Sequence, residues 1–197
     1  MNRFMWFFIS AAVIGVVFIL FMSMRFSNIE TPKYTVLSTI GKVEIRKYPQ
    51  MITATARLKS SDYDEEGSTG FRTVASYIFG GNSSNQKIAM TAPVIMNMGD
   101  SSTLSFVMPS EYELNDLPSP SNSNVSVKKQ ESKTLAVLEF GGFSSDKKIK
   151  KYATQLKDTL NAHNVEINGA LLYMGYNAPW DVINRKNEVA FEVNWNK

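Results

Sequence analysis

Polar and apolar residues alternate along much of the chain after residue 34, a pattern typical of β-strands with one buried face. The clearest alternation runs through Met51–Leu58, where aliphatic side chains at even positions are separated by threonine or arginine at odd positions. Pro49-Gln50 precedes it and predicts a turn. Similar patterns predict strands over Val43–Tyr48, Ile88–Met98, Thr103–Met108, Val125–Gln130, Thr134–Phe140, Ala170–Tyr176 and Glu188–Asn194.

Two other segments repeat apolar residues at intervals of three and four, which predicts helices with one buried face. The first helical face consists of Phe71, Val74, Ala75, Ile78 and Phe79, and Gly80-Gly81 is expected to end that helix. The second helix is predicted over Asp146–Asn161, with Ile149, Tyr152, Ala153, Leu156 and Leu160 on its apolar face.

The order of these elements repeats once along the chain. Two β-β-α-β-β units are joined by Pro109–Asn124, whose proline, serine and asparagine content is typical of an exposed loop. We therefore predict an α+β domain in which the duplicated units form a pseudo-twofold curved antiparallel sheet or distorted barrel. Two helices are expected to cover it.

The N-terminus has a different character. Phe4–Met24 contains no charged residue, and its 21 residues span roughly the 30 Å hydrocarbon layer as a helix. We predict a transmembrane anchor over residues 1–26, a linker over 27–33 and a domain over 34–197. A cleaved signal peptide is the competing interpretation, but its apolar core is usually only about 7–15 residues long. The flanking charges do not decide the orientation; a signal-anchor with so short a head favours a single-pass protein with its domain on the exported side.

Composition excludes several functions. The net charge is +3, from 21 basic and 18 acidic residues, and Arg3 and Arg25 flank the apolar run, so the domain is nearly neutral and no nucleic-acid partner is predicted. Cysteine is absent, which excludes disulfides and thiolate chemistry. His163 is the single histidine, so a multi-histidine metal site within one chain is excluded. We predict neither a catalytic residue nor a metal site.

Two features near the second helix have both structural and functional interpretations. His163 extends its apolar stripe at the C-terminal end, where an imidazole either caps the helix or offers a ligand to iron. Lys147, Lys148, Lys150 and Lys151 crowd its first turns; a solvated polar face is the simpler interpretation, and an anion site for propionates or acidic lipid head groups is the alternative.

Several motifs occur together in the chain. They are Glu44-Ile45-Arg46-Lys47-Tyr48, Lys87-Ile88-Ala89-Met90-Thr91-Ala92-Pro93-Val94, Phe140-Gly141-Gly142-Phe143-Ser144, Gly175-Tyr176-Asn177-Ala178-Pro179 and Asn184-Arg185-Lys186-Asn187-Glu188-Val189. In order and spacing they resemble the SOUL/heme-binding protein family over about residues 34 to 195. The resemblance implies the same architecture, which is shared with effector-binding domains of some bacterial transcription regulators.

The resemblance also implies non-covalent binding of heme or a related tetrapyrrole, for storage, buffering or transfer. Lys47 stands where one branch of the family has a proposed ligand histidine, so axial ligation is not implied. Candidate binding residues are Phe71, Tyr77, Met90, His163, Tyr176, Trp180 and Arg185, although core packing is the alternative for the aromatic residues and Met90. Two other functions remain open, an effector-type pocket for another apolar or cationic small molecule, and an enzyme acting on a tetrapyrrole or lipid.

Overall fold

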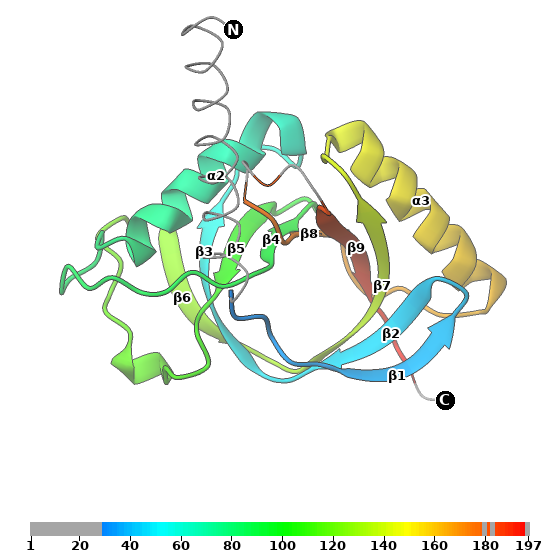
Figure 1. Cartoon of the computed structure of the whole chain (residues 1–197), viewed down its shortest axis with the longest axis horizontal. Coiled ribbons are helices and arrows are strands. Elements are labelled where there is room, and N and C mark those ends of the chain that lie inside the picture. Colours follow the sequence, from blue (N-terminus) through cyan, green and yellow to red (C-terminus); the bar gives the residue numbers. More distant parts are fainter. Residues whose placement is uncertain (1–28, 179–180, 182–183, 196–197) are drawn as a thin grey trace, which may run out of the picture.

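The computed structural model describes residues 29–178, 181 and 184–195 (Figure 1). The strands are β1 (Thr35–Ile40), β2 (Val43–Tyr48), β3 (Met51–Arg57), β4 (Val94–Asn97), β5 (Thr103–Val107), β6 (Val125–Gln130), β7 (Lys133–Gly141), β8 (Leu172–Gly175) and β9 (Lys186–Glu192). The helices are α2 (Tyr63–Ile78) and α3 (Asp146–Ala162), with a short 3-10 helix η1 (Leu114–Asp116).

The strands form one antiparallel sheet in the order β1-β2-β7-β9-β8-β4-β5-β3-β6. The strands β2, β3, β4 and β5 of the first unit correspond to β6, β7, β8 and β9 of the second. If each strand is exchanged for its counterpart, the order from β2 to β6 becomes the same order read from the other end. This is the relation expected of a pseudo-twofold axis between β4 and β8. The predicted α+β class, with its duplicated units, curved antiparallel sheet and two helices, is confirmed. β1 is an additional edge strand that the sequence did not predict.

The sheet is curved because its two ends belong to one ribbon. Val43 of β2 lies opposite Leu138 of β7, and Ala56 of β3 lies opposite Val125 of β6, in a single register that continues past Pro49. The β2–β7 half of this ribbon lies at one end of the sheet and the β3–β6 half at the other. The sheet is therefore curled into a half barrel (Figure 1).

The helices cover the convex face of the half barrel. The first cluster packs α2 residues such as Val74 and Ile78 against Ala54 and Phe106 of β3 and β5. The second packs α3 residues such as Leu156 against strands β2, β7 and β9. Because side chains alternate along a strand, the opposite set of residues faces the concave side, which neither α2 nor α3 covers.

Both helices begin with the caps that their sequences encode. Asp62 Oδ1 accepts hydrogen bonds from the backbone N of Asp64 at 2.8 Å and of Glu65 at 3.2 Å, so α2 begins before the predicted apolar face. Ser145 caps α3 in the same way. The carboxylate of Asp64 accepts from the backbone N of Asp146 at 3.1 Å, which joins the starts of the two helices.

The strand predicted over Ile88–Met98 is shorter than expected, because only Val94–Asn97 joins the sheet as β4. The residues before β4 form backbone hydrogen bonds with other segments instead. Ile88 N donates to the carbonyl of Ile78 at 2.8 Å, and Ala92 N donates to the carbonyl of Glu30 at 2.9 Å. Pro93 has no amide hydrogen to offer a neighbouring strand.

The predicted anchor over residues 1–26 lies outside the described residues. Within the part of the chain that the structure describes, neither helix combines the length and apolar content needed to cross a bilayer. The predicted linker contributes residues that contact the domain. Glu30 pairs with Thr91 in an isolated bridge, and its Oε1 accepts from Ser110 N at 3.0 Å.

Candidate functional site

The concave face of the half barrel contains a cleft of about 620 Å³, here called the concave cleft. Its walls come from both units and from Pro32 of the N-terminal segment. The residues that line it include Tyr48, Met51, Thr53, Thr55, Arg57, Ile95, Ser105, Lys128, Leu135, Leu172 and Met174.

The floor of the concave cleft is apolar. Met51, Ile95, Leu135, Leu172 and Met174 belong to a third hydrophobic cluster, which is separate from the two beneath the helices. Met174 and Leu135 are buried, whereas the other three are partly exposed toward the cleft. A ligand resting on this floor would remove apolar surface from water, which is worth about 25 cal/mol per Å².

The β3–β6 end of the cleft is polar and positively charged. Arg57 and Lys128 are exposed there, and no ion pair joins either of them to an acidic residue among the described residues. Hydroxyl groups lie between these cations and the floor, with Thr55 Oγ1 2.8 Å from Ser105 Oγ. This end is suited to an anionic group.

At the opposite end of the cleft, basic and acidic side chains of the protein neutralise one another. The Glu188 cluster consists of Arg46, Tyr48, Tyr176, Lys186 and Glu188. Arg46 Nη1 donates to Glu188 Oε1 at 3.0 Å, Lys186 Nζ lies 3.1 Å from the same oxygen, and Tyr176 Oη donates to Glu188 Oε2 at 2.6 Å. Glu188 is 0% exposed, so the cluster is a structural ion-pair network beneath the cleft.

Burial governs the protonation of this cluster. It raises the pKa of Tyr48 to about 12, although a hydrogen bond at 3.3 Å from Arg46 Nη1 acts in the other direction. The pKa of Tyr176 is raised by burial and then by the negative charge of Glu188. Burial alone would lower the pKa of Lys186, but the charge of Glu188 raises it overall. Both tyrosines therefore remain neutral and both cations charged at neutral pH.

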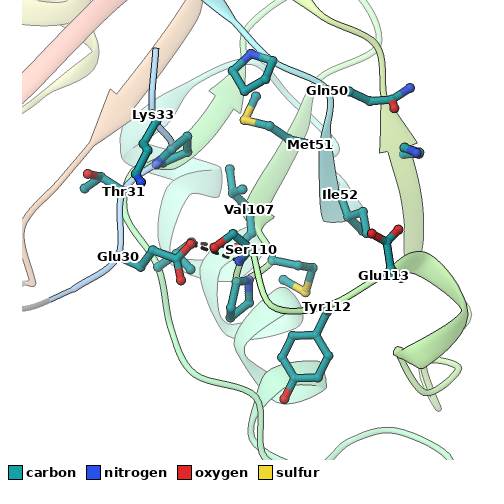
Figure 2. Close-up of a pocket in the computed structure, with 16 residues that line it drawn as sticks. Glu30, Thr31, Lys33, Gln50, Met51, Ile52, Val107, Ser110, Tyr112 and Glu113 are labelled. Carbon is teal, nitrogen blue, oxygen red and sulfur yellow. Dashed lines mark hydrogen bonds between the residues drawn. The ribbon is translucent and has the colours of Figure 1, made fainter.

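A second cavity of about 520 Å³ lies beside the concave cleft and shares Pro32 and Met51 with it. The chain's own residues 30–33 form one wall, and the segments around Ile52 and Val107 form the others (Figure 2).

The structure separates the residues that the sequence grouped as binding candidates. Phe71 and Tyr77 lie on α2 and, like Met90, pack in the cluster between that helix and the sheet; Tyr77 is 0% exposed and Phe71 is half-buried against Phe106. His163 is exposed at the end of α3, with its Nδ1 2.9 Å from the carbonyl of Thr159. These four residues lie outside the concave cleft, and their role in binding stays a prediction.

The remaining candidates lie near the loop before β9. Tyr176 packs against the apolar floor and bonds to Glu188. Arg185 Nη1 donates to the carbonyl of Ala178 at 2.9 Å and to that of Asp181 at 2.5 Å, so it holds its own loop together. Trp180 lies outside the described residues.

The α3 lysines also make local contacts. Lys148 Nζ donates to the carbonyl of Gly141 at 2.6 Å, and Lys150 pairs with Asp146 in the same helix. Among the described residues no group of acidic and histidine side chains is arranged to hold a metal ion.

Sequence reasoning missed most residues of the concave cleft. Arg57, Lys128 and Met51 each lie in a predicted strand, at positions opposite to the buried ones. Alternation therefore identifies the face on which they lie, but not that the two ends of the sheet approach each other. With its apolar floor and its positively charged end, the concave cleft suits an amphipathic ligand with an apolar body and an anionic edge.

Comparisons with known proteins agree with the fold and the motifs. The SOUL heme-binding protein family matches residues 29–192. A human protein named heme-binding protein 2 is 34% identical over 158 residues, covering 76% of this chain and 77% of its own. Mouse heme-binding protein 1 is 27% identical, covering 83% of this chain and 93% of its own. The crystal structure of the EcmrR C-terminal domain shares the fold, with a TM-score of 0.57, at 11% identity and with 83% and 99% of the two chains covered.

Proposed function

Because the chain belongs to the SOUL heme-binding protein family, we propose that it binds heme or a related tetrapyrrole non-covalently in the concave cleft. The family's description names binding rather than a reaction. The proposed role is storage, buffering or transfer of the ligand. The observation that carries the proposal is the apolar floor with Arg57 and Lys128 at one end, which have no acidic partner among the described residues.

The concave cleft fits the chemistry of heme. Heme is a flat apolar macrocycle with two propionates on one edge, and its iron supplies the redox and ligand chemistry when it is bound. The cleft volume of about 620 Å³ falls within the usual range for small-molecule sites, roughly 300–1,000 Å³. The floor would contact the macrocycle, and Arg57 and Lys128 would pair with the propionates.

Binding in this cleft does not involve His163. That side chain lies at the exposed end of α3, on the helix-covered side of the sheet, and its hydrogen bond to Thr159 accounts for its position. Methionine and tyrosine side chains, Met51, Met174 and Tyr48, are the residues of the cleft whose types also occur as iron ligands. The ligand's affinity would come mainly from apolar burial and propionate pairing.

A titration of the full-length protein with hemin, followed by the Soret absorbance, tests the proposal. Replacing both Arg57 and Lys128 by Gln is expected to weaken binding at least tenfold at low salt, with a smaller effect at high salt. Replacing Lys147, an exposed lysine on α3, is the matched control and should leave the affinity unchanged. His163→Ala should change the affinity by less than about tenfold, or 1.4 kcal/mol.

Each outcome has a distinct meaning. Loss of the shifted Soret band in His163→Ala alone would identify His163 as the ligand and overturn the cleft assignment. Full affinity in the Arg57/Lys128 variant would also place the tetrapyrrole elsewhere. The absence of any saturable band in the native protein would refute heme binding.

A cationic or apolar effector is the second candidate, because Arg46 links the buried carboxylate of Glu188 to Tyr48, which lines the concave cleft. A cation would have to compete with Arg46 and Lys186, which already neutralise that carboxylate. Titration with tetraphenylphosphonium distinguishes the two functions, because the effector hypothesis requires saturable binding that Glu188→Gln abolishes.

We also propose that residues 1–26 anchor the protein in a bilayer, with the domain on the exported side. The support is the length of the uncharged run Phe4–Met24. Full-length protein should then remain with membranes through high-salt and alkaline washes, and a chain beginning at Ser27 should not. Release by salt alone would exclude a spanning segment. Protease added outside intact cells should reach the domain only if it is exported.

A further inference from the structure

The second cavity has the composition of a site for an amphipathic molecule. Its floor is formed by the buried residues Ile52, Val107, Met108 and Pro109, with partly exposed Met51 beside them. In Figure 2 the side chain of Val107 lies between the N-terminal segment and the segments that carry Ile52 and Tyr112. An acyl chain placed there would contact apolar atoms.

The rim of this cavity carries charges of both signs. Glu30 and Glu113 approach from opposite sides of the view in Figure 2, and Lys33 and Lys129 also line the cavity. All four side chains are exposed, and no ion pair joins them to one another among the described residues. A ligand with one positive and one negative group can pair with both kinds of charge.

The position of the cavity along the chain indicates the source of such a ligand. Glu30 forms part of its wall, and only six residue steps separate Glu30 from Met24, the end of the uncharged run. Fully extended, these steps reach about 20 Å. If the run spans a bilayer, the cavity lies within that distance of the lipid head groups. Leu114, directly after Glu113, is an exposed apolar side chain.

We infer that the second cavity binds a zwitterionic phospholipid of the adjoining bilayer. Its phosphate would pair with Lys33 and Lys129, its ammonium group with Glu30 and Glu113, and one acyl chain would lie over Ile52, Val107 and Met108. The inference rests on the proposed anchor, because the anchor brings the lipid within reach. Since Pro32 of this segment also borders the concave cleft, the bound lipid would hold the wall that the two cavities share.

Methyl NMR of the full-length protein in a maltoside detergent tests this inference. With 13C-methyl methionine, Met108 reports on the second cavity and Met174 reports on the concave cleft. Soluble dihexanoyl-phosphatidylcholine is expected to shift the Met108 signal saturably and to leave the Met174 signal in place. Dihexanoyl-phosphatidylglycerol, which lacks the ammonium group, should bind at least tenfold more weakly.

Charge variants separate specific binding from partition into the floor. Replacing both Glu30 and Glu113 by Gln keeps the oxygens that accept backbone hydrogen bonds but removes the charges, so the preference for phosphatidylcholine should disappear. Glu111→Gln is the matched control, because Glu111 is exposed in the same loop but does not line the cavity.

Equal affinity for the two lipids, a shift of Met174 instead of Met108, or no saturable shift would each overturn the inference. The lipid probe is added in solution, so this result does not depend on a spanning segment. Failure of the anchor is instead recognised by release of the protein in the membrane washes.

Discussion

The buried carboxylate of Glu188 is the residue on which the concave side of the protein depends most. Its two oxygens are shared by Arg46, Lys186 and Tyr176, and the side chain has no contact with solvent. A buried ion pair contributes little compared with apolar packing, but removing one partner leaves the other charges buried and unpaired.

We therefore expect Glu188→Gln to lower the free energy of unfolding by about 3–5 kcal/mol, measured by urea denaturation. Glu139→Gln is the matched control. Glu139 is also an acidic partner of Lys186, at 3.5 Å, but its side chain is 58% exposed, so its loss should cost less than about 1 kcal/mol. Equal effects of the two substitutions would show that the Glu188 cluster is not a buried unit.

Tyr48 gives the same cluster a measurable dependence on pH. Its pKa is raised from 10.0 to about 12, so the unfolded chain loses this proton near pH 10 while the folded protein retains it. Stability from Tyr48 is therefore present below pH 10 and is lost as the pH rises through about 12. In Tyr48→Phe, the free energy of unfolding should fall less steeply over that interval, by about 1.4 kcal/mol per pH unit.

Urea denaturation of the native protein and of Tyr48→Phe at several pH values between 10 and about 12 checks this expectation. Parallel curves would mean that the hydroxyl of Tyr48 ionises as readily in the folded protein as in the unfolded chain. The experiment thus tests whether Tyr48 is buried under the conditions used.

At the scale of elements, α2 is fixed on the sheet by a close approach at Gly70. A Cβ atom at this position would lie 2.5 Å from Leu58 Cδ2 and 3.0 Å from Leu104 Cβ. Glycine lowers helix stability by roughly 1 kcal/mol relative to alanine, so the packing requirement outweighs helix propensity here.

Gly70→Ala should accordingly destabilise the protein by about 1–3 kcal/mol, despite the better helix former. Ser68→Ala in the same helix is the control, because Ser68 is exposed and alanine there should be neutral or slightly stabilising. Thermal unfolding followed by circular dichroism measures both. A stabilised Gly70→Ala variant would show that α2 is able to move away from the sheet.

For the whole molecule, the pairing of strands makes the two units interdependent. β2 pairs with β7, β3 with β6 and β4 with β8, and all three contacts join one unit to the other. In neither unit taken alone do all the strands pair into one continuous sheet. The duplicated sequence therefore encodes one folded domain.

We expect a chain cut within the exposed turn between Asn122 and Asn124 to remain assembled, whereas neither half should fold alone. Co-expression of the two halves with a tag on one, followed by affinity purification and circular dichroism, measures the association. Independent folding of residues 29–108 would refute the single domain. A further cut in the loop that precedes β9 is not needed to test the point.

Individual elements differ in how well they could be predicted from the sequence. α3 was predicted within a residue of its observed ends, because its cap and its apolar period are both local features. β1 was missed because its side chains are mostly exposed, so no alternation distinguishes it, and it exists only by pairing with β2. β4 was predicted too long because Glu30, far away in the chain, pairs with Thr91 just before it.

The candidate site, like the elements, could be predicted from the sequence only in part. The motifs pointed to the family, which the comparisons confirm, and to Tyr176, which belongs to the Glu188 cluster. Met90 belongs to one of these motifs, and Phe71 and Tyr77 were candidates with it, but the structure places all three in the packing between α2 and the sheet. Residues that form a family pattern are constrained by packing as well as by ligands, and the sequence alone does not separate the two causes.

Periodicity and motifs are local properties of the chain, and they were sufficient to predict the family, the α+β class, the duplicated units and the face of each strand other than β1. Only the tertiary structure decided which residues share a cavity. Arg57 and Lys128 line the same cleft because β3 pairs with β6, and Arg46 is neutralised because β2 and β9 flank β7. These contacts join residues far apart in the chain, and the curvature of one sheet brings them together.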